Sequence, residues 1–337
     1  MHIQSLSYGL CLFLSLLIET SLATPRYPRG YQPRPASTIF QLEHNGTWFE
    51  NLAVQSNGNL LSTRIDSPEL WSIVPNSNSS RPGHGSLLLK FPNAMSTMGI
   101  TEIDSNVFAV IAGNVSLPSV TPIPGSFVVW TVNLTSSTPK AKVLSPLPDG
   151  QFLDGMIKFG DDLLLITDAL KGVIWRLNIT TGEYSVALSH ASMLPATGQA
   201  IQVGVNGLKV LNHYVYYTST TQEIFARIPV DGNATAVGPL EIITSGFTFD
   251  DFSLTADGTA YLSTNPQNEL IQVSPEGRVR LFAGNQFMLT VGGSTTVAIN
   301  HEHSVLYLAT SGAQFAPVLG RMEPAKIVSI PLGTMKI

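Results

Sequence analysis

A short pattern of apolar runs and turns recurs six times along this chain of 337 residues, and an internal repeat constrains the fold more than any local pattern. The first copy reads "ENLAVQSNGNLLST" over residues 50–63. Its opening run recurs as "MGITEI", "DGMIKF", "NGLKVL", "DDFSLT" and "STTVAI", which begin at residues 98, 154, 206, 250 and 294. Two further β-rich runs follow each opening run, so each copy is predicted to be a unit of three strands.

The copies lie about 45 to 55 residues apart, which is the period of propeller blades. Apolar residues alternate with period two throughout, and no long helical pattern competes. We therefore predict one all-β domain, a six-bladed β-propeller over residues 37–337. The segment "STIFQLE" at 37–43 alternates like a strand and is expected to complete the last blade and close the ring. A pair of β-sandwiches is the alternative, but it would not require a motif that recurs six times.

The N-terminal segment has the pattern of an export signal. Residues 10–18 ("LCLFLSLLI") are apolar but too short to span a bilayer, and Ser21 and Ala23 are the small residues that signal peptidase requires. We predict that residues 1–23 are a removed signal peptide and that the Pro-rich residues 24–36 form an extended arm. The protein is then expected to be secreted or to reside in the lumen of the secretory pathway. The only cysteine, Cys11, lies in this leader, so the mature chain has no disulfide.

Composition and charge exclude several classes of partner. The chain is 44% hydrophobic and only 12% charged, which is enough apolar sequence for a large core. A net charge of −5, without any run of Lys or Arg, argues against nucleic acid as a partner. No second apolar segment approaches the length of a membrane span, so none is predicted. The oligomeric state is not determined by the sequence.

Four polar residues stand at the start of first strands, where a propeller opens its central channel. Glu50, Asp154, Asn206 and Asp250 should therefore converge at the channel mouth. The longest loops, residues 114–126 and 312–325, should reach the same face, and their apolar, Pro- and Gly-rich composition suits a lid over a small apolar metabolite.

Neighbouring residues complete the candidate site. Its predicted substrate-binding residues are Trp48, Phe49, Asp154, Asp251 and Thr295. A plainer interpretation stays open: Asp250 and Asp251 could cap turns, and Asn206 before Gly207 could be a turn residue.

Histidines and tryptophans elsewhere are expected to be structural or exposed. His301 and His303 flank a turn and are predicted to be exposed and not to bind metal. Trp71, Trp130 and Trp175 occupy equivalent third-strand positions, which predicts packing between blades.

The segments "ENL", "VNGLKV" and "DDFSLTADG" resemble the gluconolactonase (senescence marker protein) family of six-bladed propellers. The resemblance implies that Glu50, Asn206 and Asp250 match residues that bind a divalent cation, usually calcium, in that family. A further family Asn would fall at Leu153, which has no oxygen to offer. Because calcium requires several oxygen ligands, we expect no cofactor, or calcium bound only weakly.

A closer resemblance covers nearly the whole mature chain. "TWFENLAVQSNGNLLST", "GVNGLKV", "DDFSLTADGTAYLST" and the final "LYLATSGA" with "KIVSI" are similar to a group of secreted fungal propellers of secondary metabolism. Some members are hetero-Diels-Alderases that join a tropolone-derived o-quinone methide to a humulene-type sesquiterpene. The resemblance implies this activity, with Glu50, Asp250 and Asn206 as catalytic residues. A calcium-dependent lactonase or esterase and a ligand-binding propeller without enzymatic activity are the alternatives.

The export prediction can be tested on the secreted protein. The sequence contains six Asn-x-Ser/Thr sequons, at Asn45, Asn78, Asn114, Asn133, Asn178 and Asn233. Endoglycosidase treatment should lower the apparent mass, and N-terminal sequencing should begin near Thr24. A band that does not shift, or a protein that retains Met1, would contradict the predicted export.

Overall fold

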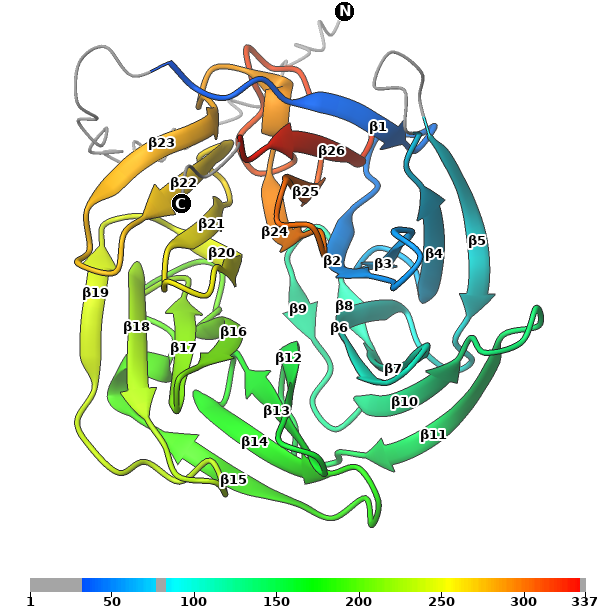
Figure 1. Ribbon diagram of the computed structural model, residues 1–337, viewed down its shortest axis with the longest axis vertical. Helices are drawn as coiled ribbons and strands as arrows, with labels where there is room; N and C mark the ends of the chain where they lie inside the picture. Colours follow the sequence, from blue (N-terminus) through cyan, green and yellow to red (C-terminus); the bar gives the residue numbers. More distant parts are fainter. Residues whose placement is uncertain (1–31, 77–82, 334–337) are drawn as a thin grey trace, which may run out of the picture.

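The computed structural model describes residues 32–76 and 83–333 and confirms the six-bladed β-propeller (Figure 1). Six four-stranded antiparallel sheets surround a central axis. The strands of the first three blades are β2 (Phe49–Val54), β3 (Leu60–Arg64), β4 (Glu69–Val74) and β5 (His84–Lys90); β6 (Ser96–Asp104), β7 (Val107–Gly113), β10 (Val128–Asn133) and β11 (Lys140–Pro146); and β12 (Leu153–Phe159), β13 (Leu163–Asp168), β14 (Val173–Asn178) and β15 (Tyr184–Ser189).

The other three blades have the same order. Their strands are β16 (Val205–Leu211), β17 (Tyr214–Ser219), β18 (Ile224–Pro229) and β19 (Glu241–Ser245); β20 (Phe249–Leu254), β21 (Ala260–Thr264), β22 (Glu269–Val273) and β23 (Val279–Gly284); and β24 (Ser294–Ile299), β25 (Val305–Thr310), β26 (Lys326–Pro331) and β1 (Ser37–Gln41). The innermost strands of the six blades are β2, β6, β12, β16, β20 and β24. A small hairpin of β8 (Val115–Ser116) and β9 (Thr121–Pro122) lies in the loop of blade two. The only helical turns among the described residues are the 3-10 helices η1 (Ala191–Met193) and η2 (Leu289–Val291).

The sequence pattern missed the outermost strand of the first five blades, because each predicted unit had three strands and the sheets have four; only β1 of blade six was predicted. The outer strands β5, β11, β15 and β19 are mostly exposed or half-buried on both faces. A strand that buries neither face has no need for alternating apolar residues, so its period-two signal is weak.

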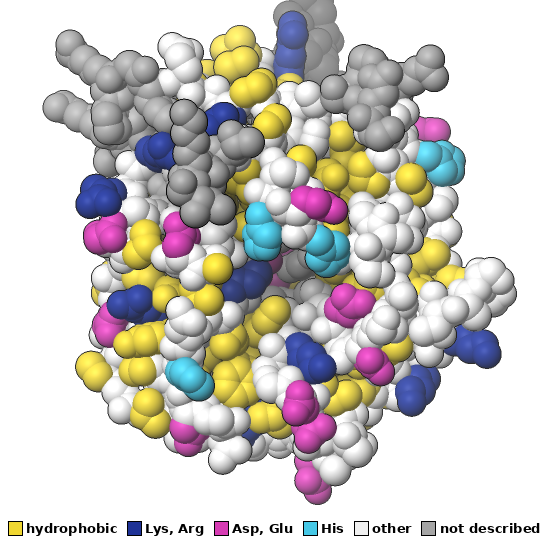
Figure 2. Space-filling model, in the orientation of Figure 1, with side chains coloured by type: hydrophobic (Ala, Val, Ile, Leu, Met, Phe, Trp, Pro, Cys, Tyr) yellow, Lys and Arg dark blue, Asp and Glu magenta, His cyan; other side chains and the backbone are white. Residues whose placement is uncertain are grey.

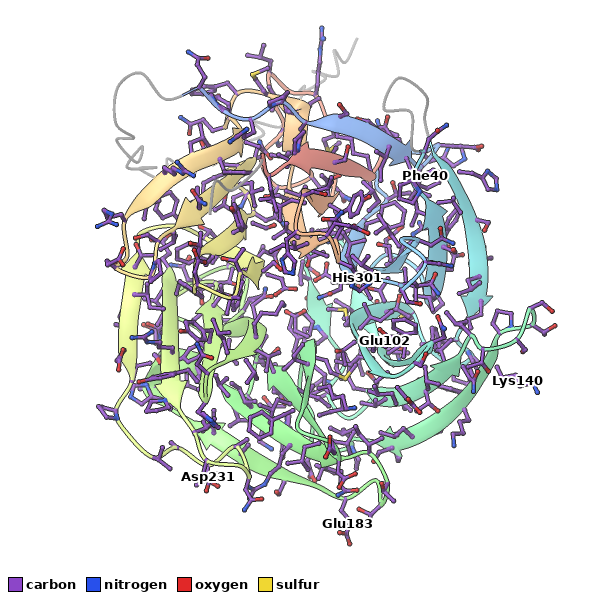
Figure 3. All side chains as sticks on the ribbon, in the orientation of Figure 1. Phe40, Glu102, Lys140, Glu183, Asp231 and His301 are labelled. Atoms are coloured by element: carbon purple, nitrogen blue, oxygen red, sulfur yellow. The ribbon has the colours of Figure 1, made fainter. Side chains whose placement is uncertain are left out.

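The ring closes as predicted, by pairing the start of the chain with its end. β1 runs antiparallel to β26, with Ser37 opposite Ser329 and Gln41 opposite Lys326. Phe40 of β1 then packs against blade one, with its ring centroid 5.8 Å from that of Trp71 (Figure 3). The first residues of the described arm extend from β1 along blade five, where Arg34 N donates to Phe282 O. Hydrogen bonding and aromatic packing close the ring.

Two of the three third-strand tryptophans pack between blades, and the third packs within its own blade. Trp71 contacts Phe40 from blade six, and Trp130 packs edge-on against Phe91, which follows blade one. These two confirm the predicted packing between blades. Trp175 instead contacts Tyr184 of its own blade, and its indole N–H donates to Asp168.

Some sequence predictions lie outside the described residues. They are the signal peptide at 1–23, the first part of the arm and the sequon at Asn78. Within the described ranges, no helix is long and apolar enough to cross a membrane.

A β-bulge at the start of every inner strand is the feature of the fold that positions the site. In blade four, Val205 pairs with Ser219 and Leu208 with Tyr217, so two residues on the inner strand stand opposite one on its neighbour. The same register shift occurs in β2, β6, β12, β20 and β24. In a regular strand, successive side chains point to opposite faces of the sheet, and a bulge interrupts this alternation. Here the interruption occurs at the same place in all six inner strands.

Threonines on the second strands fix these bulges to the next blade. The Thr167 hydroxyl accepts a hydrogen bond from Gly155 N at 2.7 Å and donates to Asn206 O at 2.6 Å. Thr218 does the same between Gly207 N and Asp250 O. Each hydroxyl therefore joins the bulge of its own blade to the bulge of the next.

The substitution Thr167→Val tests this bond. It keeps the shape of the side chain but leaves Gly155 N and Asn206 O, both buried, without their partner. We expect a loss of about 1–3 kcal/mol in the free energy of unfolding, measured by chemical denaturation. The control Thr38→Val, at an exposed position on β1, should change stability little. Equal effects of the two changes would contradict a special role for Thr167.

Candidate functional site

The six bulges place one residue of each blade at the same height around the channel mouth. The first bulge residues, read from the strand registers, are Glu50, Met98, Asp154, Asn206, Asp250 and Thr295. All six are at most 7% exposed. The structure thus brings together Glu50, Asp154, Asn206 and Asp250, as the sequence predicted, and places the predicted substrate-binding residue Thr295 in the same ring.

The register places Leu153 and Asp154 in different environments. Leu153 pairs with Asp168 outside the bulge and is fully buried in the apolar core, so it offers no oxygen to the mouth. Asp154 is the first bulge residue of this blade, in the position that Asn206 has in blade four.

The three mouth carboxylates hold protons more tightly than ordinary acids. Burial, followed by repulsion from Asp250 and Asp154, raises the pKa of Glu50 well above its usual value. Burial and repulsion from Asp154 do the same for the pKa of Asp250, although hydrogen bonds from Asn265 and Asn206 lower it. Burial, with Asp251 as the second cause, raises the pKa of Asp154 to about 7. Asp154 can therefore donate or accept a proton near neutral pH, while Glu50 and Asp250 keep their protons to higher pH than ordinary acids.

Two amides bind Asp250 and orient it. Asn206 Nδ2 lies 3.1 Å from Asp250 Oδ1, and Asn265 Nδ2 lies 3.3 Å from its Oδ2. Asn265 lies in the turn between β21 and β22, and sequence analysis missed it because it is not part of the repeated first strand. Its only signal was the polar turn "STNPQN" after the second run of blade five.

Asp251, the second bulge residue of blade five, forms a separate layer below the mouth. Its Oδ1 accepts from Lys209 Nζ at 2.7 Å and from Phe252 N, and its Oδ2 accepts from Thr296 Oγ1 and Asn51 Nδ2. These contacts connect blades one, four, five and six across the channel. Asp251 is thus engaged with protein partners, and its charge acts on the mouth acids from below.

The aromatic residues before Glu50 have different environments. Trp48 is buried, its ring lies 5.3 Å from that of Phe315 in the 312–325 loop, and its backbone N–H donates to Asp66. Phe49 is fully buried in the core beside Phe40 and Trp71, so it supports the site from behind. Trp48 therefore remains a candidate wall, whereas Phe49 lies away from the channel mouth.

Both long loops pack over the mouth side, as predicted for a lid. Residues Val115, Leu117 and Val120 of one loop and Phe315 of the other belong to the same apolar cluster as Trp48. Gln314 Nε2 donates to Thr47 O, and Gly125 N donates to Gly150 O, so each loop is attached next to an inner strand. The Thr295 hydroxyl donates to Phe49 O and thereby joins blade six to blade one.

Several buried polar atoms at the mouth have no hydrogen-bond partner within the described protein. They include Glu50 Oε2, Trp48 Nε1 and Asn265 Oδ1. The Trp48 indole is close enough to lower the pKa of Glu50, but the two groups do not reach normal hydrogen-bond geometry. Buried polar atoms without partners cost free energy, so these three point to a polar group that the site receives.

The remaining sequence candidates lie at the surface. His301 and His303 are exposed in the turn between β24 and β25, at the end of β24 that lies away from its bulge. Figure 3 shows His301 near the axis, and its ring contacts Gln55 O. Among the sequons in the described residues, the Asn side chains are exposed at Asn45, Asn133 and Asn233 and half-buried at Asn114 and Asn178.

The mouth residues do not fit a resident calcium ion as they stand. Calcium takes about six to eight oxygen ligands that converge on one point. Within the described ranges, no three His, Cys, Asp or Glu residues are placed so that they could hold a metal ion. The amides of Asn206 and Asn265 also direct their nitrogens, and not their oxygens, at Asp250.

Known proteins similar to this chain agree with the predicted resemblance. The chain is 22% identical to a protein of Phoma sp named for a presumed hetero-Diels-Alderase activity, over 89% of this chain and 93% of that protein. It is 24% identical to a Sarocladium schorii protein named for the same presumed activity, over 69% of this chain and 66% of that protein. The predicted resemblance to propellers that include hetero-Diels-Alderases is confirmed.

Solved structures support the fold. Regucalcin, a calcium-binding protein of Agrobacterium tumefaciens strain C58, superposes with a TM-score of 0.63 at 12% identity, covering 89% of this chain and 95% of that chain. At this identity the similarity concerns the architecture alone. No known protein family's sequence profile matches the chain.

The raised pKa of Asp154 predicts how stability depends on pH. Because the folded state binds this proton more tightly than the unfolded chain, the contribution favours folding fully below pH 3.8 and is lost as pH rises through about 7. Asp154→Asn should therefore melt at a higher temperature than the parent protein at pH 8 and show a smaller fall between pH 4 and pH 8. The matched control is Asp161→Asn, an exposed acid on the opposite face. A fall of the same size in Asp154→Asn and the parent would exclude Asp154 as the titrating group.

Proposed function

We propose that this protein is a hetero-Diels-Alderase of fungal secondary metabolism, which joins a tropolone-derived o-quinone methide to a humulene-type sesquiterpene. The observation that carries the proposal is a group of buried acids with raised pKa values beneath apolar loops. The names of the two similar proteins support the same reaction class.

The first step would be dehydration of a hydroxymethyl tropolone. A protonated mouth acid, for which Glu50 is our choice, donates its proton to the leaving hydroxyl, and the C–O bond breaks to release water. A second carboxylate, Asp250 or Asp154, accepts the proton of the tropolone hydroxyl. The raised pKa values support these roles: Glu50 keeps its proton to higher pH than an ordinary acid, and Asp154, whose pKa is raised to about 7, can accept one near neutral pH. The products are the o-quinone methide and one water molecule.

The second step would be the cycloaddition itself. The alkene of the sesquiterpene adds across the O=C–C=CH2 unit, forming one C–O and one C–C bond without gain or loss of atoms. No nucleophile is needed, so the contribution of the site is to orient the two reactants, which can supply roughly 7–11 kcal/mol. Trp48 Nε1 and Asn265 Nδ2 are donors near the mouth acids, and Asn206 helps to hold Asp250. The loops over Trp48 would keep water from the quinone methide.

The location of this activity is part of the proposal. A leader at residues 1–23 and exposed sequon residues at Asn45, Asn133 and Asn233 support passage through the secretory pathway. We therefore propose a secreted glycoprotein that receives small apolar substrates. Neither a nucleic-acid partner nor a resident cofactor is part of this proposal.

A calcium-dependent lactonase is the second candidate. Asp154 favours it, because its carboxylate lies at the mouth with those of Glu50 and Asp250 and adds to the oxygen atoms there. Activity that disappears with a calcium chelator and returns with calcium, together with cleavage of a lactone, would favour the lactonase. Tight binding of a metabolite that is recovered unchanged would favour a binding protein.

The test is the stereochemistry of the product. Purified protein, a hydroxymethyl tropolone and humulenol should give one stereoisomer of the adduct, with or without chelator. Glu50→Gln should slow its formation by roughly a hundredfold, because general acid catalysis contributes at least this factor. Glu302→Gln, a change of an exposed acid on the opposite face, is the matched control and should react like the parent. The same mixture of adducts with and without protein would disprove the proposal.

A further inference from the structure

The indole of Trp48 is buried, but its only polar atom has no partner in the protein. Trp48 is 5% exposed, and its Nε1 finds no hydrogen-bond acceptor among the described residues. Two other tryptophans use this group within the fold. Trp71 Nε1 donates to Glu69 at 2.9 Å. Trp175 Nε1 donates to Asp168 at 3.1 Å. Because a buried indole N–H normally donates a hydrogen bond, the unpaired N–H of Trp48 indicates an acceptor that a ligand supplies.

Contacts on several sides hold Trp48 in place. Its backbone N–H donates to Asp66 Oδ1 at 3.0 Å, and Arg64 Nε lies 3.1 Å from the same oxygen. Both side chains of this Arg64–Asp66 ion pair are largely buried. The indole ring packs edge-on against Phe315, with 5.3 Å between the ring centroids. These contacts restrict the indole before a ligand binds, so its N–H is a donor that needs little rearrangement.

The neighbour of this N–H is the carboxyl group of Glu50. The Trp48 indole is close enough to lower the pKa of Glu50, although the two groups do not reach normal hydrogen-bond geometry. Glu50 Oε2 is also buried without a partner in the described protein. Burial nevertheless raises the pKa of Glu50 well above its usual value, so this acid keeps its proton to higher pH. The pair therefore presents an N–H donor next to a carboxyl group, which suits two neighbouring oxygens of a neutral ligand.

A hydroxymethyl tropolone carries two such oxygens. The product of its dehydration contains the unit O=C–C=CH2, so the ring oxygen that becomes the carbonyl oxygen and the hydroxymethyl group are attached to neighbouring ring carbons. With Glu50 at the leaving hydroxyl, the neighbouring N–H of Trp48 is placed for the ring oxygen.

We propose that Trp48 Nε1 donates a hydrogen bond to this ring oxygen and is a catalytic residue of the dehydration. The inference rests on the proposed function. A mouth carboxylate takes the proton of the ring hydroxyl, the C–O bond of the hydroxymethyl group breaks to release water, and the electron density left on the ring oxygen forms the carbonyl. A fixed N–H stabilises that density, and Trp48 keeps its own proton throughout. The same hydrogen bond withdraws electron density from the heterodiene and so favours addition of an electron-rich alkene.

The first experiment follows the indole N–H in the parent protein by NMR. The sequence has four tryptophans, so the ¹⁵N-labelled protein should give four indole N–H signals, and Trp48→Phe identifies the signal of Trp48. The probe is tropone, a ring ketone, and its control is cycloheptatriene, which has the same ring size without the oxygen. Tropone should shift the Trp48 signal downfield, as a hydrogen bond does, and cycloheptatriene should not. No shift with tropone, or the same shift with both rings, would overturn the proposal.

The second experiment measures reaction and affinity in Trp48→Phe, which keeps an apolar ring beside Phe315 but removes the N–H. Adduct formation should slow by about tenfold to a hundredfold. The dissociation constant of tropone should rise by about three- to tenfold, whereas that of cycloheptatriene should stay the same. The control is Trp130→Phe, a change at a half-buried position on the third strand of blade two, which should behave like the parent. Melting temperatures establish that both variants are folded. Equal weakening for the two rings would show that Trp48 acts by packing alone and would contradict its role as a donor.

These measurements separate the role of Trp48 from the proposed function. If the parent gives one adduct stereoisomer, and Trp48→Phe both reacts and binds tropone like the parent, the role of Trp48 is wrong and the function stands. If the parent leaves the adduct mixture unchanged while tropone shifts the Trp48 signal, the proposed reaction is wrong and Trp48 stands as the donor of a site for a ring ketone.

Discussion

The rest of the structure depends on the β-bulge at the start of each inner strand. Each bulge directs one residue of its blade to the channel mouth, and at Thr167 and Thr218 a buried hydroxyl bonds that bulge to the next blade. Close approach makes this possible: a Cβ atom on Gly155 would lie 2.6 Å from Asn206 O. The same local feature therefore packs the blades around the axis and aligns the functional side chains.

The acids of the channel mouth lower the stability of the folded protein at neutral pH. Burial and mutual repulsion disfavour the ionised forms of Glu50, Asp154 and Asp250, which is a cost to folding at neutral pH. Asp251, one residue deeper, is compensated by Lys209 and three further donors. The two layers therefore have different roles. The Asp251 carboxylate holds blades together, whereas the mouth carboxylates of Glu50, Asp154 and Asp250 can exchange protons with a substrate.

The two faces of the ring have different physical tasks. The face with the turns between first and second strands carries charged side chains among hydrophobic ones, as Figure 2 shows. The mouth face combines buried acids with exposed apolar loops, so polar chemistry lies inside and apolar contact lies outside. Propeller topology permits this division, because every inner strand begins on one face and ends on the other.

The sequence by itself determined the blade number, the closing strand and the four polar residues of the mouth, because a repeated period-two pattern records which residues every blade buries. It did not reveal the outer strands of the first five blades, most of which bury little, or Asn265, which comes from a turn outside the repeat. Only the tertiary structure decided that Phe49 packs into the core and not at the mouth, and that Asp251 bonds to Lys209 below the mouth. The reason is physical: a bulge changes which side chain faces the axis, and contacts between blades join residues far apart in sequence, such as Asn51 and Asp251, which are 200 positions apart.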